Sequence, residues 1–464
     1  MKRSLLHILF ANVVFLIISI VNSFLLPRYL SIDTYAVLKT YTLYIGYAGF
    51  LSLGYADGMY LKYGGAKLED IQISELSSNL KSYIALQGVV SLFLLSVAVI
   101  LKDYVLIAFA IGSLCINIIG YYKNFYQAIG EYRLYGQSLN YQTFILFLLN
   151  LVLLFVWKIK APMLYIGIQV ISAIATAIYL TWVLEKKTSL WHLGQIRFSE
   201  IKTNIVSGFS LMLGNFSSSV FTSLDRWFVK ILFDSSSFAH YSFAVSLENI
   251  INVFITPITI SLYNVFCKNP EKAYIYRIKK LTLLWGFMII ALFFPVKFIL
   301  SYYLTKYYVS VNILYPLFGA QAFYAVIKGI SVNLYKAERK QTVYFKVMAC
   351  MIVVSIALNI IVYKLLHTSD AFAIATLLTS IIWFMYCEWE RPEIRFTFKE
   401  YSAIILLLLS YVLACRLDNM AIGLLCYLVA YSTIFLVFMR ESLKDIIIAA
   451  TPFVGKLLKN KAEE

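Results

Sequence analysis

Charged residues are scarce in this sequence, and their scarcity excludes a soluble protein. Only 14% of the 464 residues are charged and 61% are hydrophobic, whereas soluble domains contain about 25% charged residues on average. The loops between apolar runs are also short, and even the longest, residues 185–202, leaves no room for a soluble domain. The composition therefore predicts an integral membrane protein.

Residues that carry enzyme chemistry are few as well. The six cysteines form no C-x-x-C pair and the four histidines have no metal-ligand spacing, so we expect no metal site. The sequence has no Walker A loop, which excludes ATP hydrolysis by that route. The outer loops have neither the paired acids of a lipid-sugar glycosyltransferase nor the large loop of a polysaccharide polymerase. We therefore expect a protein that is not an enzyme and has no cofactor.

Apolar runs divide the chain into about fourteen spans of membrane-crossing length. The spans are expected at 5–26, 34–56, 79–101, 104–128, 137–157, 161–184, 203–224, 238–266, 281–303, 311–334, 342–364, 370–388, 401–415 and 420–439. The first run is too long for the core of a signal peptide, so we interpret it as an uncleaved helix. Because 401–415 is short, twelve spans plus a hairpin remain an alternative.

The net charge of +16 fits the cytoplasmic loops of a membrane protein, and we expect no nucleic-acid partner. With the N-terminus inside, 28 of the 40 lysines and arginines fall in the inner loops and ends, and 11 fall in the outer ones. This bias predicts that both termini are cytoplasmic and that the number of spans is even. The inner cations are also suited to anionic lipids of the bilayer.

A weak internal repeat predicts two lobes. Residues 31–36 and 234–239 each open an even-numbered span after a basic outer loop, about 203 residues or six spans apart. An offset of six spans gives both copies the same orientation, as in parallel repeats of transporters. We therefore expect an N-terminal six-helix lobe at 1–200 and a C-terminal six-helix lobe at 201–396. Residues 397–464 then form a helix pair and a cytoplasmic tail.

Several charged residues lie inside the expected spans. Inserting a charged residue near the centre of a bilayer costs about 2.5–3.5 kcal/mol of free energy, so such residues are functional candidates. Glu248 is placed near the midplane, while Lys39, Lys297 and Lys328 lie at other depths. Structural explanations are the alternative to a functional role. Lys39, Lys297 and Asp225–Arg226 can be explained by snorkelling or by an ordinary pair at a helix end. Glu248 can be explained by a hydrogen bond between helices.

Three segments resemble the polysaccharide or O-antigen-type flippases of the multidrug/oligosaccharidyl-lipid/polysaccharide (MOP) exporter superfamily. They are Leu30–Ala36, at the entry to the second span, Leu53–Gly65, at its end, and Ser223–Trp227, with an acid-arginine pair at the end of the seventh. In the repeat, Ala36 and Ala239 stand where the family often has glycine.

The resemblance implies two six-helix lobes around a cavity that opens alternately to each side of the membrane. Its cargo would be an undecaprenyl-pyrophosphate-linked oligosaccharide, moved from the inner to the outer leaflet of the bacterial cytoplasmic membrane for surface polysaccharide assembly. A polysaccharide polymerase and glycosyltransferases are then expected partners. In such proteins a basic cavity receives the pyrophosphate and the sugars.

The candidate site residues fall into two groups. Candidates for a cationic cavity are Arg28, Lys39, Lys62, Arg226, Lys297 and Lys328. Candidates for ion coupling or helix pairing are Asp57, Asp225, Glu248, Asn249 and Asn252, with Na⁺ or H⁺ as the coupling ion. Two alternatives stay open: a drug or cation antiporter of the same superfamily, and an enzyme such as a polymerase or a membrane glycosyltransferase. A net basic cavity favours an anionic lipid headgroup, and a net acidic one favours drugs.

Overall fold

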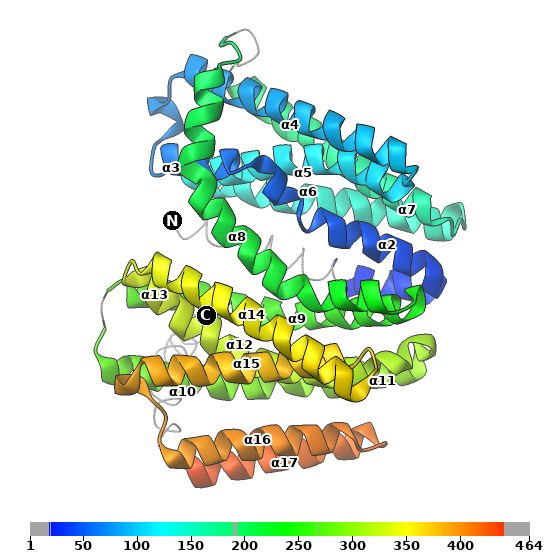
Figure 1. The fold of residues 1–464 in the computed structure, drawn as a ribbon, viewed down its shortest axis with the longest axis vertical. Helices are drawn as coiled ribbons and strands as arrows, with labels where there is room; N and C mark the ends of the chain where they lie inside the picture. Colours follow the sequence, from blue (N-terminus) through cyan, green and yellow to red (C-terminus); the bar gives the residue numbers. More distant parts are fainter. Residues whose placement is uncertain (1–17, 19, 189–192, 269, 440–464) are drawn as a thin grey trace, which may run out of the picture. The chain divides into compact units, whose positions relative to one another are not determined.

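The computed structural model describes residues 18, 20–188, 193–268 and 270–439, and every regular element in these residues is helical (Figure 1). Twelve helices in this part of the chain are long and apolar enough to cross a membrane. In lipid a helix satisfies its own backbone hydrogen bonds, which is why apolar runs of this length become helices. The prediction of an all-α, multi-pass membrane protein is confirmed.

The twelve membrane-crossing helices coincide with the third to fourteenth predicted spans. They are α4 (Ile73–Leu101), α5 (Tyr104–Ala128), α6 (Tyr132–Leu151), α7 (Pro162–Thr188), α8 (Phe198–Leu232), α9 (Ser235–Phe266), α10 (Lys272–Ile289) continued by α11 (Phe293–Tyr302), α12 (Val311–Val326) continued by a π-helical turn and α13 (Asn333–Ala337), α14 (Gln341–Leu366), α15 (Ala371–Glu390), α16 (Phe398–Cys415) and α17 (Met420–Phe438). The first predicted span lies mostly outside the described residues.

The second predicted span is interrupted rather than continuous. It consists of α2 (Ile32–Ile45), a short 3-10 segment (Ala48–Ser52) and α3 (Tyr55–Lys62). The break falls at Leu53 and Gly54, whose φ angles of 52° and 85° are left-handed. Glycine adopts this conformation without strain, so Gly54 can redirect the chain into α3. The expected helix over 34–56 therefore becomes two helices joined by a turn.

Helices α3 and α8 cross at very short distance through glycines. A Cβ atom added to Gly58 would lie 2.0 Å from the carbonyl oxygen of Asn204, and one added to Gly208 would lie 2.0 Å from that of Gly54. A side chain at either position would force the two backbones apart. This crossing places the polar residues of α3 against those of α8.

The chain forms two compact units. The first contains Met1–Leu224 and Asp234–Ala239, and the second contains Asp225–Phe233 and His240–Glu464. Helix α8 therefore supplies residues to both units. The finer division into 1–200, 201–396 and 397–464 stays a prediction.

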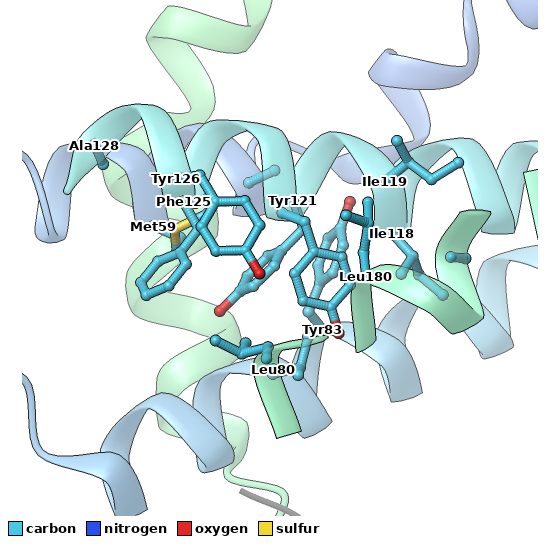
Figure 2. Packing of buried hydrophobic residues seen from close by; sticks show 14 of the residues in the cluster. Met59, Leu80, Tyr83, Ile118, Ile119, Tyr121, Phe125, Tyr126, Ala128 and Leu180 are labelled. Atoms are coloured by element: carbon cyan, nitrogen blue, oxygen red, sulfur yellow. The ribbon is translucent and has the colours of Figure 1, made fainter. Parts of the chain in front are cut away.

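Tyrosines fill the core of the first unit (Figure 2). The ring of Tyr83 packs against those of Tyr55 and Tyr121, with centroid distances of 5.0 and 5.1 Å. Three of the buried hydroxyls find acceptors, as buried tyrosines usually do: Tyr55 donates to the carbonyl oxygen of Asn79, Tyr83 donates to that of Asn117, and Tyr121 donates to Oδ1 of Asn79. These bonds fix α3, α4 and α5 relative to one another.

Buried ion pairs join α10 to α15 and to α16 in the second unit. Lys279 on α10 pairs with Glu388 on α15, and both side chains are almost completely buried. The neighbouring Lys280 lies 3.5 Å from Glu400, which also caps the start of α16. These two lysines, which the sequence presented only as inner-loop cations, thus have structural partners. Removing one member of such a pair would leave an uncompensated buried charge.

Candidate functional site

The first unit contains a partly open polar cavity of about 190 Å³ between the segment before α3, α3 itself, α4, α5 and α8. Its polar lining includes Asp57, Asn117, Lys123, Asn124, Asn215 and Ser219, and its aromatic lining includes Tyr47, Phe50, Tyr83 and Phe216. The cavity therefore combines one acid, one cation and several amides with aromatic rings. Such a lining can bind a polar group that has apolar faces.

Asp57 is held at the cavity by the crossing of α3 and α8. It precedes Gly58, whose close contact with α8 fixes this turn of α3. Nδ2 of Asn215 on α8 donates a 3.2 Å hydrogen bond to Oδ1 of Asp57. The structure thus brings one of the predicted coupling residues into a cavity and gives it a neutral partner.

Lys123 on α5 lines the same cavity, and sequence reasoning missed it. In the part of the chain that the structure describes, its ammonium group has no hydrogen-bond or ion-pair partner. The residue lies five positions before the end of a predicted span, where hydropathy does not distinguish it from an inner-loop cation. The sequence did indicate a polar helix face at this residue, because Asn117, Gly120 and Asn124 recur beside it at helical spacing.

Aromatic rings form one wall of the cavity. The rings of Phe50 and Phe216 lie 4.3 Å apart between centroids, and the ring of Tyr47 lies 6.0 Å from that of Phe216. The hydroxyl of Tyr47 is hydrogen-bonded to that of Ser223 on α8. The wall therefore joins the segment around 47–50 to α8.

The second unit contains a separate polar cluster on α8, α9 and α12. Nε2 of Gln321 donates a 2.5 Å hydrogen bond to Oε1 of Glu248, and the hydroxyl of Tyr241 donates a 2.7 Å bond to Oδ2 of Asp225. Asp225 is buried. Glu248 also interacts electrostatically with Asp225, Arg226 and Lys328.

The cations of this cluster are Arg226 and Lys328. Nζ of Lys328, in the π-helical turn after α12, donates a 3.4 Å hydrogen bond to Oδ1 of Asn252 and lies 5.4 Å from the ring centroid of Tyr324. Nε of Arg226 is buried without a hydrogen-bond partner among the described residues. Two acids and two cations therefore meet within membrane-spanning helices, and the cluster has no formal net charge.

The structure places most of the other predicted residues apart from these two groups, but Asn249 adjoins the second group through Asn252. Lys39 lies 5.1 Å from the ring centroid of Tyr35, while Arg28 is exposed. Nζ of Lys62 contacts Glu75 at 2.7 Å and Glu200 at 3.0 Å. Asn249 is exposed, and its Oδ1 accepts a 3.5 Å hydrogen bond from Asn252.

Lys297 is bound at the end of a neighbouring helix. Its Nζ donates to the carbonyl oxygens of Cys415, at 3.0 Å, and Leu417, at 2.7 Å. The first oxygen belongs to the last residue of α16 and the second lies two residues beyond it, at the helix end where the dipole favours a cation. The residue thus stabilises the contact between α11 and α16.

The fold is similar to those of solved membrane transporters. The lipid II flippase MurJ, in an inward closed conformation, superposes with a TM-score of 0.70 and 14% identity over 95% of this chain and 99% of MurJ. A multidrug resistance MATE family transporter of the MOP superfamily, in an outward-facing conformation, gives a TM-score of 0.51 and 12% identity over 85% of this chain and 96% of that one. The MATE transporter ClbM in complex with Rb⁺ gives a TM-score of 0.50 and 12% identity over 86% of this chain and 95% of ClbM.

No family model matches the sequence, and no curated protein is similar to it in sequence. The likeness therefore lies in the arrangement of the helices along nearly the whole chain. The likeness expected from the three sequence segments is confirmed at the level of the fold. The chain shares the fold of MurJ and of these two MATE transporters.

Proposed function

We propose that this protein is a flippase that moves an undecaprenyl-pyrophosphate-linked oligosaccharide from the inner to the outer leaflet by alternating access. The observation that carries the proposal is the polar cavity of the first unit, because it offers a cation, amides and aromatic rings among membrane-embedded helices. An anionic headgroup cannot enter hydrocarbon without such groups to offset its desolvation. The lipid tail can stay in the bilayer during this movement.

The likeness to MurJ supports the same function. MurJ is described as a lipid II flippase, and its fold matches along 95% of the present chain. Fold alone does not determine the cargo. The cavity has one acid and one cation, so its charge does not choose between the candidates, and the choice of an oligosaccharide rests on its amides and aromatic rings and on the three sequence segments. The surface polysaccharide pathway would supply the partners, a polymerase and glycosyltransferases.

A drug or cation antiporter is the second candidate, and the cluster in the second unit favours it. Asp225 and Glu248 are carboxylates within membrane-spanning helices, which can bind and release H⁺ or Na⁺. ClbM, which shares the fold, is described in complex with Rb⁺. The two candidates are compatible in part, because ion binding at this cluster can also drive a flippase. An enzyme remains the third and weakest alternative.

The test uses a strain that lacks the gene. We expect it to lose surface polysaccharide and to accumulate the lipid-linked oligosaccharide, and the wild-type gene to restore both. Lys39→Ala and Lys328→Ala should insert normally but restore export poorly, whereas the exposed Lys67→Ala serves as the matched control. Unchanged surface polysaccharide in the deletion strain, together with loss of organic-cation efflux, would establish the antiporter instead.

We also propose that the protein lies in the bacterial cytoplasmic membrane with both termini in the cytoplasm. Reporter fusions after Ser237 and after Glu464 test this orientation. The first should report the periplasm and the second the cytoplasm. A periplasmic signal at the C-terminus would contradict the orientation derived from the lysine and arginine bias.

A further inference from the structure

Helices α5 and α7 pack side by side in the first unit, and an open apolar groove of about 420 Å³ runs between them. The groove shares no lining residue with the polar cavity. Its apolar walls include Leu114, Cys115 and Ile118 on α5 and Ile174, Ile178 and Trp182 on α7. The side chains of Ile178 and Trp182 are 64% and 57% exposed, so the groove opens toward the surroundings of these membrane-spanning helices.

The walls of the groove suit a hydrocarbon chain. The hydroxyl of Thr181, which lines it, already accepts a 2.8 Å hydrogen bond from the hydroxyl of Tyr122 and donates a 2.7 Å bond to the carbonyl oxygen of Ala177. A polar ligand would lose its hydrogen bonds to water there without replacing them, whereas a hydrocarbon has none to lose. The volume lies within the range of pockets that hold small ligands, about 300–1,000 Å³, and is sufficient for a segment of one chain.

The length of the groove matches one leaflet of a bilayer. Its α7 wall extends from Ile174, near the middle of the helix, to Glu185, about one turn before the helix ends at Thr188. At 1.5 Å per residue this wall is about 16 Å long, and half of the hydrocarbon core of a bilayer is about 15 Å. Trp182 lies near the same end, and tryptophan is enriched at the level of the lipid headgroups. The groove therefore fits an acyl chain whose headgroup lies beside the C-terminus of α7.

Side chains of opposite charge lie at this headgroup end. Glu185 lines the groove itself, and Nζ of Lys186 lies 5.4 Å from the ring centroid of Trp182. A carboxylate has about four acceptor positions, so Glu185 can keep its contacts within the protein and still accept a hydrogen bond from a ligand. A purely anionic headgroup would pair with Lys186 but would be repelled by Glu185. A headgroup that contains both an ammonium and a phosphate complements both residues.

We infer that the groove between α5 and α7 binds a phospholipid of the phosphatidylethanolamine type from the surrounding bilayer. An acyl chain fills the apolar groove, the phosphate accepts a hydrogen bond from Lys186, and the ammonium donates one to Glu185. The inference goes beyond the proposed function, because this lipid is not the cargo and the site lies outside the polar cavity. It requires only that α5 and α7 lie in a bilayer.

The test measures the quenching of Trp182 fluorescence by brominated lipids in nanodiscs that contain the purified full-length protein. The signal of Trp182 is the difference between the wild type and Trp182→Phe. Four probes with the same brominated acyl chains are added at a low fraction to unbrominated phosphatidylcholine: phosphatidylethanolamine, phosphatidylcholine, phosphatidylglycerol and diacylglycerol. Choline has methyl groups in place of the ammonium hydrogens, phosphatidylglycerol has no ammonium, and diacylglycerol has no phosphate.

We expect phosphatidylethanolamine to associate about fivefold more strongly than phosphatidylcholine, as the upper range of an exposed ion pair allows. Phosphatidylglycerol should associate no more strongly than phosphatidylcholine, and diacylglycerol should associate more weakly. Equal quenching by all four probes would show ordinary contact with bulk lipid and would overturn the inference. Stronger quenching by phosphatidylglycerol than by phosphatidylethanolamine would show a general attraction of anionic lipids and would also overturn it.

Variants assign the two contacts to individual side chains. Each variant is measured with and without Trp182→Phe, so that the signal of Trp182 is again isolated. Glu185→Gln should abolish the preference for phosphatidylethanolamine over phosphatidylcholine. Lys186→Gln should reduce the preference for phosphatidylcholine over diacylglycerol. Both positions are at least partly exposed, so the variants should fold, and Lys202→Gln, at an exposed position of α8 in the same unit, should match the wild type. An undiminished ethanolamine preference in Glu185→Gln, or an undiminished phosphate preference in Lys186→Gln, contradicts the inferred site.

Discussion

The ammonium nitrogen of Lys62 lies 2.7 Å from Oε1 of Glu75, so the cation at the end of α3 ties this short helix to the start of α4. The same nitrogen lies 3.0 Å from Oε2 of Glu200 at the start of α8. One lysine thus joins three helices. Asn79 reinforces the group, because its Nδ2 donates a 3.3 Å hydrogen bond to Glu200.

Lys62→Met should therefore destabilise the first unit modestly. The change leaves Glu75 and Glu200 close together without a cation, and partly exposed pairs of this kind contribute up to about 1 kcal/mol. Thermal unfolding in detergent measures the loss, and adding Glu200→Gln to the variant should restore part of it. Normal thermal stability combined with loss of export would instead favour a direct role of Lys62 in substrate binding.

Gly58→Ala should disturb the crossing of α3 and α8. The new Cβ atom would lie 2.0 Å from the carbonyl oxygen of Asn204, and overpacking of this kind costs about 1–3 kcal/mol or more. We expect a lower unfolding temperature and a lower yield of monodisperse protein. Gly88→Ala is the control, because nothing lies within 4 Å of its added Cβ atom. Equal behaviour of the two variants would show that the helices can separate without cost.

Lys297→Met should weaken the attachment of the C-terminal helix pair. Methionine keeps the apolar length of the side chain but loses both hydrogen bonds to the end of α16. Hydrogen bonds to charged groups contribute about 1.5–3 kcal/mol, so we expect a lower unfolding temperature and faster proteolysis between α15 and α16. Lys364→Met, at an exposed position of α14, is the control. Unchanged stability with defective export would place Lys297 in the transport path.

Glu248→Gln should reduce export severalfold while the protein level stays normal. Glutamine keeps the shape of the side chain and can still accept the hydrogen bond from Gln321, but it has no charge. The electrostatic interactions with Arg226 and Lys328 are then lost. Surface polysaccharide is compared at equal expression, with the exposed Glu271→Gln as the control. Wild-type export would leave Glu248 a purely structural role.

Acid should destabilise the contact between Glu338 and Arg391. The side-chain hydrogen bond from Arg391 lowers the pKa of Glu338 below its ordinary value of 4.5. Its stabilising contribution is therefore fully present above pH 4.5 and is lost as the pH falls through the lower pKa of the folded state. Glu338→Gln should unfold at a lower temperature than the wild type at pH 6, and the difference should shrink toward pH 3. A constant difference across this range would contradict the assignment.

The sequence by itself determined the membrane-spanning helices. Twelve of the fourteen predicted spans are helices, because the length and apolarity that favour a membrane helix are local properties and such a helix satisfies its own backbone. The interruption at Gly54 could not be inferred from hydropathy. At this position the chain turns through a left-handed φ angle, and the backbone of Phe209 on α8 leaves no room for a side chain.

Only the tertiary structure decided the surroundings of the interior charges. Sequence reasoning grouped Lys62, Lys297 and Lys328 as candidates for one cationic cavity. In the structure Lys62 meets two carboxylates, Lys297 meets carbonyl oxygens at and just beyond the end of α16, and Lys328 meets Asn252. Lys123, near the end of a span, instead lines a cavity with Asp57. The physical reason is that a helix pattern fixes the depth and face of a charge, whereas its partners come from helices distant in sequence.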